Sequence, residues 1–163
     1  LSRTGLFTRL FFLAGHNSGE LATYIERESL VYVKCVIERE PLGTAGAVRD
    51  AARWFGAYDS SFFIFNGDTF CDVDYEAMLA YHKATNSTIT VACDWYFRHV
   101  GTFVASRRFI DLIPSGVKVD MAEVFTLLGQ RHEPVGWFMT DAPFYDIGDE
   151  VGLFRFRTMM LDK

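Results

Sequence analysis

The amino-acid sequence predicts an α/β fold, specifically a three-layer α/β/α sandwich around a mostly parallel, Rossmann-like sheet. Strand-like and helix-like segments alternate along almost the whole chain, an order typical of parallel strands joined by helices. Residues 61–65 form a continuous apolar run, S-F-F-I-F, of the kind found in a parallel strand covered on both faces. The chain has 163 residues, half of them hydrophobic, so we expect a single domain over residues 1–163 with a sizeable core.

Each predicted element rests on a local pattern. Strands are predicted where apolar and β-branched residues run together, at residues 8–14, 30–37, 61–65, 88–93, 101–105 and 135–139. Helices are predicted where apolar residues recur at helical spacing, at residues 20–28, 45–55, 75–84, 107–113 and 120–128, and from about residue 149 onwards. Clusters of Gly, Pro and Asn separate these segments, as turns require.

Composition and charge argue against several classes of function. The formal net charge is -5 and no Lys/Arg run occurs, which argues against a nucleic-acid partner. No apolar run is long enough to span a bilayer, and the first residues lack the layout of a signal peptide, so we expect a cytoplasmic protein with no membrane partner. Cys35, Cys71 and Cys93 form no C-x-x-C pair, and we expect small buried side chains in a reducing compartment rather than zinc ligands.

The residues that follow each predicted strand are candidates for a site, because ligands of open parallel sheets bind beyond the carboxyl ends of the strands. The segment from Glu38 to Ala47 reads E-R-E-P-L-G-T-A-G-A. Gly43 and Gly46 remove side chains where the backbone must approach something closely, and Thr44 can cap the following helix. The N–H groups of that first turn offer a hydrogen-bonding surface. Taken alone, the segment is better explained as a simple strand–turn–helix link.

Asn66-Gly67-Asp68 ends the apolar run 61–65 abruptly. Asn-Gly is the strongest two-residue hairpin signal, yet the next residues lead into a helix rather than back along a partner strand. An aspartate at this position projects into the ligand crevice, and the carboxylates of Asp68, Asp72 and Asp74 could serve a hard cation. Asp74 is equally well placed to cap the helix that follows.

A further acidic position follows the last predicted strand, in the segment F-Y-D-I-G-D. Asp146 lies between apolar neighbours, which predicts a partly buried carboxylate. A buried carboxylate needs a partner, and a metal ion, a helix cap and a salt bridge all stay open at this point.

Three of these segments together resemble the family of sugar-1-phosphate nucleotidyltransferases, which includes glucose-1-phosphate thymidylyltransferases and mannose-1-phosphate guanylyltransferases. They are residues 38–47, residues 65–68 (F-N-G-D) and residues 145–148 (Y-D-I-G), and the unbroken P-L-G-T-A-G-A is quite specific. Residues 104–116 also resemble the segment that follows the family's N-x-G-x-Y stretch. The resemblance covers most of the chain, from residue 8 to the final helix, and implies the nucleotide-diphospho-sugar transferase type of fold.

The resemblance implies that the protein transfers a nucleotidyl group from a nucleoside triphosphate to a sugar 1-phosphate, giving a nucleotide sugar and pyrophosphate. It implies that Asp68 and Asp146 are catalytic residues that bind Mg²⁺. The residues implied to bind the nucleotide or the sugar nucleotide are Glu38, Leu42, Gly43, Thr44, Ala45, Gly46, Asn66 and Gly67. The resemblance does not determine the nucleobase, the sugar or the oligomeric state, and an oligomer is one of the options.

The sequence departs from the family in two places. The family begins with a strand and a loop of the form G-G-x-G-T-R-L, which no segment of this chain matches. Between Cys93 and Gly101 the family has two strands and an E-K-P stretch, whereas residues 94–100 fill that interval here, and His99 falls where the family has Asn. We therefore expect that the domain is incomplete at the N-terminus and near residues 94–100, with a strand, a loop and a helix upstream and an inserted flap near residue 95.

Three alternatives compete with nucleotidyl transfer. A catalytically inactive homologue would bind a nucleotide sugar or a partner subunit. A metal-dependent glycosyltransferase would use a D-x-D motif, which Asp72-Val73-Asp74 matches literally. A nicotinamide-binding domain needs G-x-G-x-x-G after a strand, and the spacing of Gly43 and Gly46 is wrong for that motif.

Overall fold

The computed structural model describes residues 5–15, 18–30, 32–38, 40–55 and 60–161. The chain divides into two compact units, Leu1–Tyr58 with Ile110–Arg131, and Asp59–Phe109 with His132–Lys163. We describe each unit by itself. That residues 1–163 form a single domain therefore stays a prediction.

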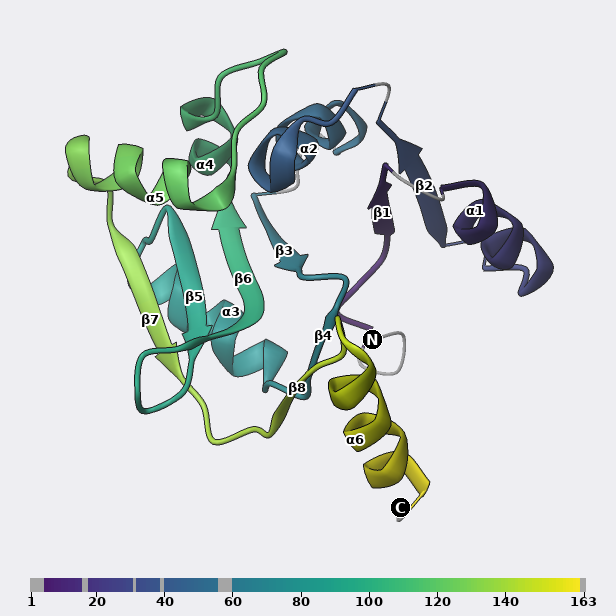
Figure 1. Ribbon diagram of the computed structural model, residues 1–163. Coiled ribbons are helices and arrows are strands. Elements are labelled where there is room, and N and C mark those ends of the chain that lie inside the picture. The colour runs from purple at the N-terminus through teal and green to yellow at the C-terminus, as the bar shows by residue number, and fades with distance from the viewer. Residues whose placement is uncertain (1–4, 16–17, 31, 39, 56–59, 162–163) are drawn as a thin grey trace. The chain divides into compact units, whose positions relative to one another are not determined.

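The first unit is built on two parallel strands. It contains β1 (Leu10–Ala14), α1 (Ser18–Arg27), β2 (Val33–Ile37), α2 (Gly43–Ala51), the short 3-10 helix η1 (Ala52–Trp54) and α5 (Met121–Gln130). β1 and β2 pair in parallel, from Leu10 opposite Val33 to Ala14 opposite Ile37. α1 packs against β2 (Figure 1) and buries Ile25. α2 contacts both β1 and α5.

The second unit contains a four-stranded sheet. Its elements are β3 (Ser61–Phe65), β4 (Thr69–Cys71), α3 (Tyr75–Ala84), β5 (Ile89–Cys93), β6 (His99–Ser106), β7 (Val135–Met139), β8 (Phe144–Asp146) and α6 (Glu150–Leu161). The sheet order is β3-β6-β5-β7. β5 and β7 are parallel, whereas β6 is antiparallel to both β3 and β5. α4 (Arg107–Leu112) crosses the boundary between the units.

The α/β class predicted from the sequence is confirmed, and the sheet is more mixed than expected. β3, β5 and β7 run in one direction, as predicted, but β6 runs against its neighbours. The continuous apolar character of β5, which is buried at every position, agrees with a central strand covered on both faces.

The core of the second unit lies where α3 packs against the sheet (Figure 1). Its buried members are Cys71, Val73, Met78, Ala92, Val100 and Val104, with Phe63, Tyr75, Leu79, Phe138, Ala142 and Phe144 packed around them. Cys71 and Cys93 are buried and Cys35 is half-buried, and all three are free thiols. The prediction of small apolar cysteines is therefore confirmed for Cys71 and Cys93, and holds in part for Cys35.

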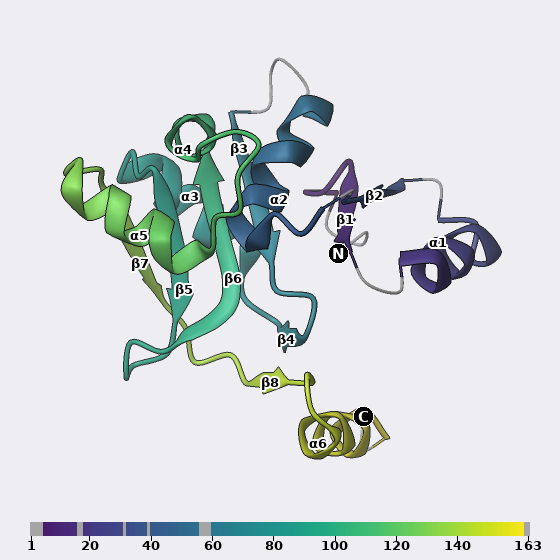
Figure 2. The same cartoon turned by 45° about the horizontal axis from the view of Figure 1, so that its top comes forward.

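Two short strands form a separate ladder in the second unit. β4 and β8 pair antiparallel over three residue pairs, and β8 leads into α6 (Figure 2). Both strands were missed by the sequence analysis because three residues are too few to show an alternation. The predicted strand 101–105 is longer in the structure, His99–Ser106, and Gly101 lies inside it with φ +71. A Cβ at Gly101 would lie 2.8 Å from the Cβ of Thr69, so this glycine permits a close approach of β4.

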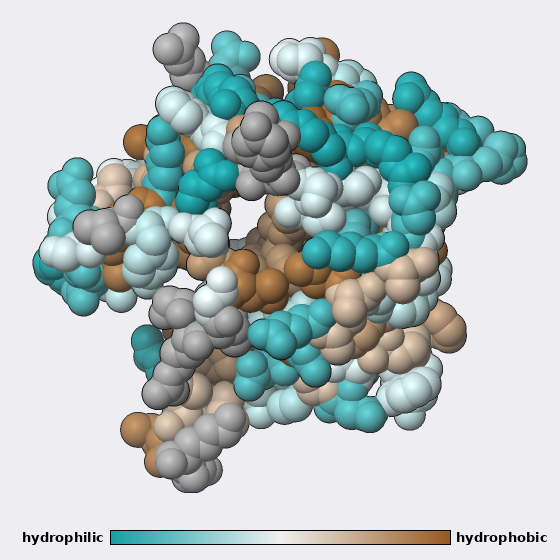
Figure 3. Space-filling model, turned by 180° about the vertical axis from the view of Figure 1, so that it is seen from behind, coloured by the Kyte–Doolittle hydropathy of each residue, from teal (hydrophilic) through white to brown (hydrophobic). Residues whose placement is uncertain are grey.

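α6 is apolar on more than one face. Val151, Phe154, Met160 and Leu161 are exposed, and hydrophobic atoms are visible on the surface at its C-terminal end in Figure 3. No helix in the described part of the chain is long and apolar enough to cross a membrane.

Candidate functional site

The turn after β3 presents Asp68 at the surface of the second unit. Asn66 donates its N–H to the carbonyl of Gly101 at 2.8 Å, which fixes the start of the turn. The next strand, β4, pairs with β8 and not with β3, so the prediction that Asn66-Gly67 does not form a simple hairpin is confirmed. Asp68 is exposed, and its carboxylate accepts a hydrogen bond from the Thr69 hydroxyl at 3.3 Å.

Asp146 ends β8, and its carboxylate is exposed. The prediction of a partly buried carboxylate is therefore wrong. Its apolar neighbours do not enclose it, because successive residues of a strand point to opposite faces. One oxygen of Asp146 accepts the N–H of Gly148 at 3.0 Å, which leaves the other oxygen directed away from this turn bond.

The β4–β8 ladder brings Asp68 and Asp146 together. Asp146 lies opposite Thr69 in the register of the two strands. The N–H of Ile147 donates to the carbonyl of Asp68 at 2.7 Å. A Cβ placed on Gly148 would lie 3.2 Å from Oδ1 of Asp146 and 3.4 Å from Oδ2 of Asp68, so these oxygens are separated by no more than the sum of those distances.

The two carboxylates have the chemistry of ligands for a hard divalent cation. Gly148 leaves open the position between the two carboxylates, which any larger residue would fill. Among the described residues no cluster of three or more His, Cys, Asp or Glu side chains could hold a metal. Mg²⁺ does not need such a cluster, because it is usually held by one or two carboxylates together with substrate phosphates and water.

Asp72 and Asp74 do not join this pair as metal ligands in the described structure. Asp74 is the N-cap of α3, where its carboxylate accepts the N–H of Ala77 at 2.9 Å, as predicted. Asp72 is exposed and lies beyond the end of β4. One member of the D-x-D motif is thus already engaged as a helix cap.

The loop of the first unit is shaped by two glycines. α2 begins at Gly43, with Leu42 as the N-cap and no side-chain cap, so the prediction that Thr44 caps the helix is wrong. Gly43 has φ +71, and a Cβ there would lie 2.6 Å from the carbonyl oxygen of Val119. A Cβ on Gly46 would lie 3.2 Å from the carbonyl oxygen of Val117. The close approach predicted for these glycines is therefore to the segment before α5.

The N–H groups of this turn are partly used within the chain. Ala45 and Gly46 both donate to the carbonyl of Val119 at 3.1 Å, and Val119 donates to the carbonyl of Leu42 at 2.8 Å. The expected hydrogen-bonding surface at the start of α2 is correspondingly smaller. The side chain of Thr44 is exposed, whereas Ala45 and Gly46 are buried.

Glu38 lies at the carboxyl end of β2 in the same unit. Its N–H donates to the carbonyl of Ala14 at 3.0 Å and continues the parallel ladder. Its Oε1 accepts the N–H of Leu42 at 3.4 Å, and its Oε2 lies 3.2 Å from the position of a Cβ on Gly15. Glu38 thus links the two strand ends to the start of the Leu42–Gly46 loop.

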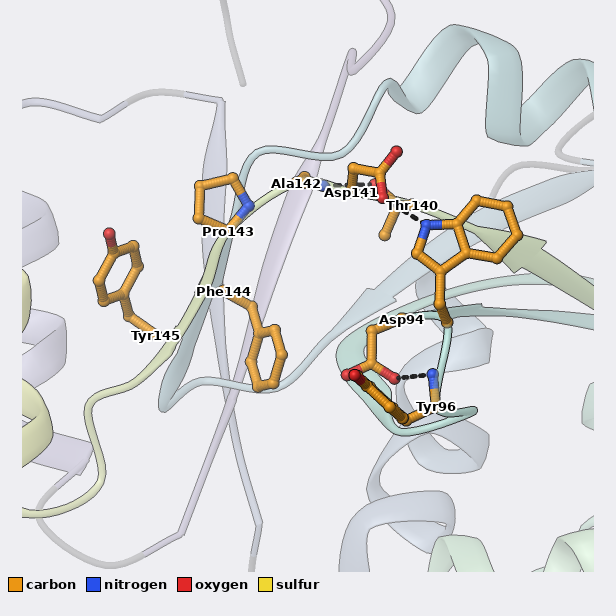
Figure 4. A pocket seen from close by; sticks show the side chains of 9 residues that line it. Asp94, Tyr96, Thr140, Asp141, Ala142, Pro143, Phe144 and Tyr145 are labelled. Atoms are coloured by element: carbon orange, nitrogen blue, oxygen red, sulfur yellow. Dashed lines mark hydrogen bonds between the residues drawn. The ribbon is translucent and has the colours of Figure 1, made fainter.

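A groove of about 400 Å³ opens in the second unit beside β8 (Figure 4). Its lining comes from two segments, namely Asp94, Trp95 and Tyr96, and Thr140, Asp141, Ala142, Pro143, Phe144 and Tyr145. The indole N–H of Trp95 donates to a carboxylate oxygen of Asp141. Two of the lining residues, Trp95 and Tyr96, are 63% and 82% exposed, and no site at this groove was predicted from the sequence.

Asp94 organises one wall of the groove. Its Oδ1 accepts the N–H groups of Tyr96 and Arg98 at 2.9 and 3.0 Å, and its Oδ2 accepts Nε of Arg98 at 2.7 Å. Desolvation raises the pKa of Asp94, but the hydrogen bonds from Arg98 and Tyr96 outweigh it and hold that pKa below its ordinary value. The Arg98 guanidinium also lies 5.6 Å from the centroid of the Tyr96 ring and 5.7 Å from that of Phe144.

The chain shares its fold with several solved structures. The chain superposes on HddC from Yersinia pseudotuberculosis complexed with GMP-PN with a TM-score of 0.73, at 23% identity, over 91% of this chain and 76% of that chain. It superposes on a putative glucose-1-phosphate thymidylyltransferase from Bacillus anthracis with a TM-score of 0.70, at 12% identity, over 86% of this chain and 71% of that chain. These likenesses define the class of fold, a mixed α/β nucleotide-diphospho-sugar transferase domain.

The chain belongs to the nucleotidyl transferase family, whose sequence pattern it matches over residues 3–100. Over 71 residues it is 38% identical to the mannose-1-phosphate guanyltransferases of Hypocrea jecorina and Gibberella zeae. That alignment covers 44% of this chain and 19% of each of those proteins. The matched segment therefore spans only about a fifth of the length of these relatives.

Proposed function

We propose that this protein transfers a nucleotidyl group from a nucleoside triphosphate to a sugar 1-phosphate and releases pyrophosphate. The observation that carries the proposal is the juxtaposition of Asp68, which directly precedes β4, and Asp146, which ends β8 opposite Thr69. These two acidic residues come from the ends of distant segments, and a shared position between their carboxylates is kept open by Gly148. Membership of the nucleotidyl transferase family supports the same reaction.

In this reaction an oxygen of the sugar phosphate forms a bond to the α-phosphorus of the triphosphate, and the bond from that phosphorus to pyrophosphate breaks. No covalent enzyme intermediate is required, so the protein contributes mainly positioning and charge neutralisation. Asp68 and Asp146 would hold Mg²⁺, which when bound neutralises phosphate charge and orients the phosphates. The exposure of both carboxylates leaves them accessible to a phosphate ligand.

The residues proposed to contact the nucleotide or the sugar nucleotide come from each of the two units. The proposed contacts are Glu38, Leu42, Gly43, Thr44, Ala45, Gly46, Asn66 and Gly67. Two sets of contacts hold the backbone of the Leu42–Gly46 loop, namely its hydrogen bonds with Val119 and the bond from the Leu42 N–H to the Glu38 carboxylate. We propose guanine as the first base to test, because the aligned relatives are guanyltransferases.

The groove beside β8 is the proposed place for the sugar. The aromatic rings of Trp95 and Tyr96 offer flat apolar faces. The side-chain oxygens of Thr140 and Asp141 can accept hydrogen bonds from sugar hydroxyl groups. Phe144 and Tyr145, which line the groove, directly precede Asp146 in β8. A sugar ring in the groove would therefore lie along the strand that ends at the proposed metal ligand.

Mg²⁺ dependence, a cytoplasmic location and the absence of nucleic-acid and membrane partners remain part of the proposal. Mg²⁺ dependence rests on the chemistry of the Asp68 and Asp146 carboxylates, and the other statements rest on the charge and hydropathy of the sequence. An oligomer is compatible with the exposed apolar side chains of α6.

The test is turnover by the full-length protein with a panel of triphosphates and sugar 1-phosphates, followed through pyrophosphate release. We expect release with Mg²⁺ and its loss in Asp68→Asn. Asp72→Asn is the matched control, because it makes the same change at a neighbouring exposed aspartate outside the pair. Release that persists in Asp68→Asn but is lost in Asp72→Asn would place the metal ligand at Asp72 and contradict the proposed role of Asp68. A glycosyltransferase would release no pyrophosphate from these substrates, because its donor is a nucleotide sugar.

The inactive-homologue alternative gives a different result in the same experiment. A protein of that kind would release no pyrophosphate with any substrate pair. It would still be stabilised by a nucleotide sugar in a thermal-shift measurement, since any ligand that binds the folded state raises its apparent stability.

A further inference from the structure

The β4–β8 ladder is too small to be stable by itself. It contains three residue pairs, and an isolated two-stranded ladder is at best marginally stable in water unless another element packs against it. Yet this ladder holds Asp68 and Asp146 next to each other. Some other element must therefore fix the separation of the two carboxylates.

α6 is that element. The ring of Phe156 lies 4.9 Å, centroid to centroid, from the ring of Phe70 in β4, and 5.9 Å from the ring of Tyr145 in β8. One side chain of the helix thus contacts both strands of the ladder. Phe70 and Tyr145 are opposite each other in the register, so Phe156 covers the middle pair.

Gly152 lets α6 approach β8 closely. It lies in the first turn of the helix, and its N–H donates to Oδ1 of Asp149 at 2.6 Å. A Cβ on Gly152 would overlap with the carbonyl oxygen of Asp146 and would lie 2.9 Å from its carbonyl carbon. Backbone atoms cannot rotate out of the way as a long side chain can, so a larger residue must move either the helix or the end of β8.

We propose that Gly152 and Phe156 are positioning residues that set the separation between the carboxylates of Asp68 and Asp146. Phe156 holds the two strands of the ladder together from one face, and Gly152 fixes the end of β8 against the first turn of α6. Neither residue is proposed to touch substrate. The inference rests on the proposed function for its consequence in metal binding, but its structural part concerns the ladder alone.

The test uses the full-length protein and two readouts. The first is hydrogen exchange of the Ile147 amide, which donates to the Asp68 carbonyl and so reports directly on the ladder. The second is binding of Mn²⁺ as a spectroscopic probe, measured by electron paramagnetic resonance without substrate. The variants are Gly152→Ala and Phe156→Leu, with Gly129→Ala in α5 as the control, because a Cβ there would meet no atom within 4 Å.

We expect exchange at Ile147 to be faster by about tenfold in both variants, while amides of β5 keep their protection. We expect Mn²⁺ affinity to fall by roughly tenfold or more, as is usual when residues that orient metal ligands are altered. Gly129→Ala should change neither quantity. Phe156→Leu keeps an apolar side chain, so it remains informative if Gly152→Ala does not fold.

Unchanged exchange at Ile147 in a folded variant would overturn the inference, whatever happens to activity. If exchange accelerates but the unmodified protein binds no Mn²⁺, the positioning role stands and the proposed metal site fails. If exchange accelerates while Mn²⁺ affinity stays constant, α6 stabilises the ladder without setting the carboxylate separation, and the inference is wrong.

Discussion

The N–H of Ile147 donates a hydrogen bond to the carbonyl of Asp68 at 2.7 Å. This bond joins the turn after β3 to the segment between β8 and α6, and it places Asp68 beside Asp146. The sequence gives no local sign of the contact, because the two aspartates are far apart along the chain. The proposed reaction depends on this juxtaposition more than on any other feature.

Gly148→Ala tests the open position between the two carboxylates. The added Cβ would lie 3.2 Å from Oδ1 of Asp146 and 3.4 Å from Oδ2 of Asp68, where a cation is proposed to bind. We expect turnover to fall by roughly tenfold or more, with a change in unfolding free energy below about 1 kcal/mol. Turnover and urea denaturation of the same samples measure the two effects, and unchanged turnover in folded Gly148→Ala contradicts the proposed cation position.

Gly43→Ala tests the role of the first glycine of P-L-G-T-A-G-A. Gly43 has φ +71, and a Cβ there would lie 2.6 Å from both the Val119 carbonyl oxygen and Oδ1 of Asp120. We expect destabilisation by more than about 1 kcal/mol, because the backbone conformation and the close approach both exclude a side chain.

The matched control for this change is Gly116→Ala. Gly116 has φ +72 but no atom within 4 Å of an added Cβ, so it carries the conformational cost alone. Urea denaturation should show a larger loss for Gly43→Ala than for Gly116→Ala. Equal losses would mean that contact with Val119 contributes nothing.

Trp95→Ala tests the groove beside β8. The indole ring lines the groove and is oriented by its hydrogen bond to Asp141. We expect KM for the sugar 1-phosphate to rise by about tenfold, equivalent to roughly 1.4 kcal/mol, with KM for the triphosphate unchanged. Trp137→Ala, which removes another exposed indole that does not line the groove, should leave both constants as they are. A rise in KM for the triphosphate alone would assign the groove to the nucleotide.

His82 predicts an acid-sensitive stability. The residue is 2% exposed, and its Nδ1 lies 2.9 Å from the hydroxyl oxygen of Thr90. Burial lowers the pKa of His82 below 6.5, and the charges of Arg108 and Lys83 lower it further. The unfolded chain therefore binds a proton first as the pH falls, so stability is full above about pH 6.5 and declines below it, by at most about 1.4 kcal/mol per pH unit.

Urea denaturation at several pH values between about 5 and 7.5 measures this effect. We expect His82→Asn to reduce the dependence of the unfolding free energy on pH. The control is His132→Asn at an exposed histidine, which should leave this dependence unchanged. An unchanged slope in His82→Asn would show that another group is responsible.

The sequence was sufficient to predict the class of fold and most elements. Long patterned segments such as 75–84 and 135–139 were placed at the bounds that the structure shows, because their apolar periodicity reflects one buried face. β4 and β8 were missed, since strands of three residues carry no periodic signal and are stabilised by each other and by α6. The antiparallel direction of β6 was also not predictable, because strand direction depends on the connections between strands.

The candidate site was also predictable only in part from the sequence. The motif around residues 38–47 was recognisable, but the partner of its glycines, the segment before α5, lies more than seventy residues further along the chain. Asp146 was singled out on the expectation of a partly buried carboxylate, and that expectation is wrong because the residue is exposed. Its role in a site stays a prediction. Gly152 gave no sequence signal beyond an isolated glycine in a helix, because its importance lies in a contact with the end of β8.

The most direct test of the account is a double-mutant cycle on Mn²⁺ binding by the full-length protein with Asp68→Asn, Asp146→Asn and both changes together. If the two carboxylates hold one cation, each single change should remove most of the affinity, and the double change should cost much less than the sum of the two. Strictly additive losses, or an affinity that neither single change alters, would contradict a shared site.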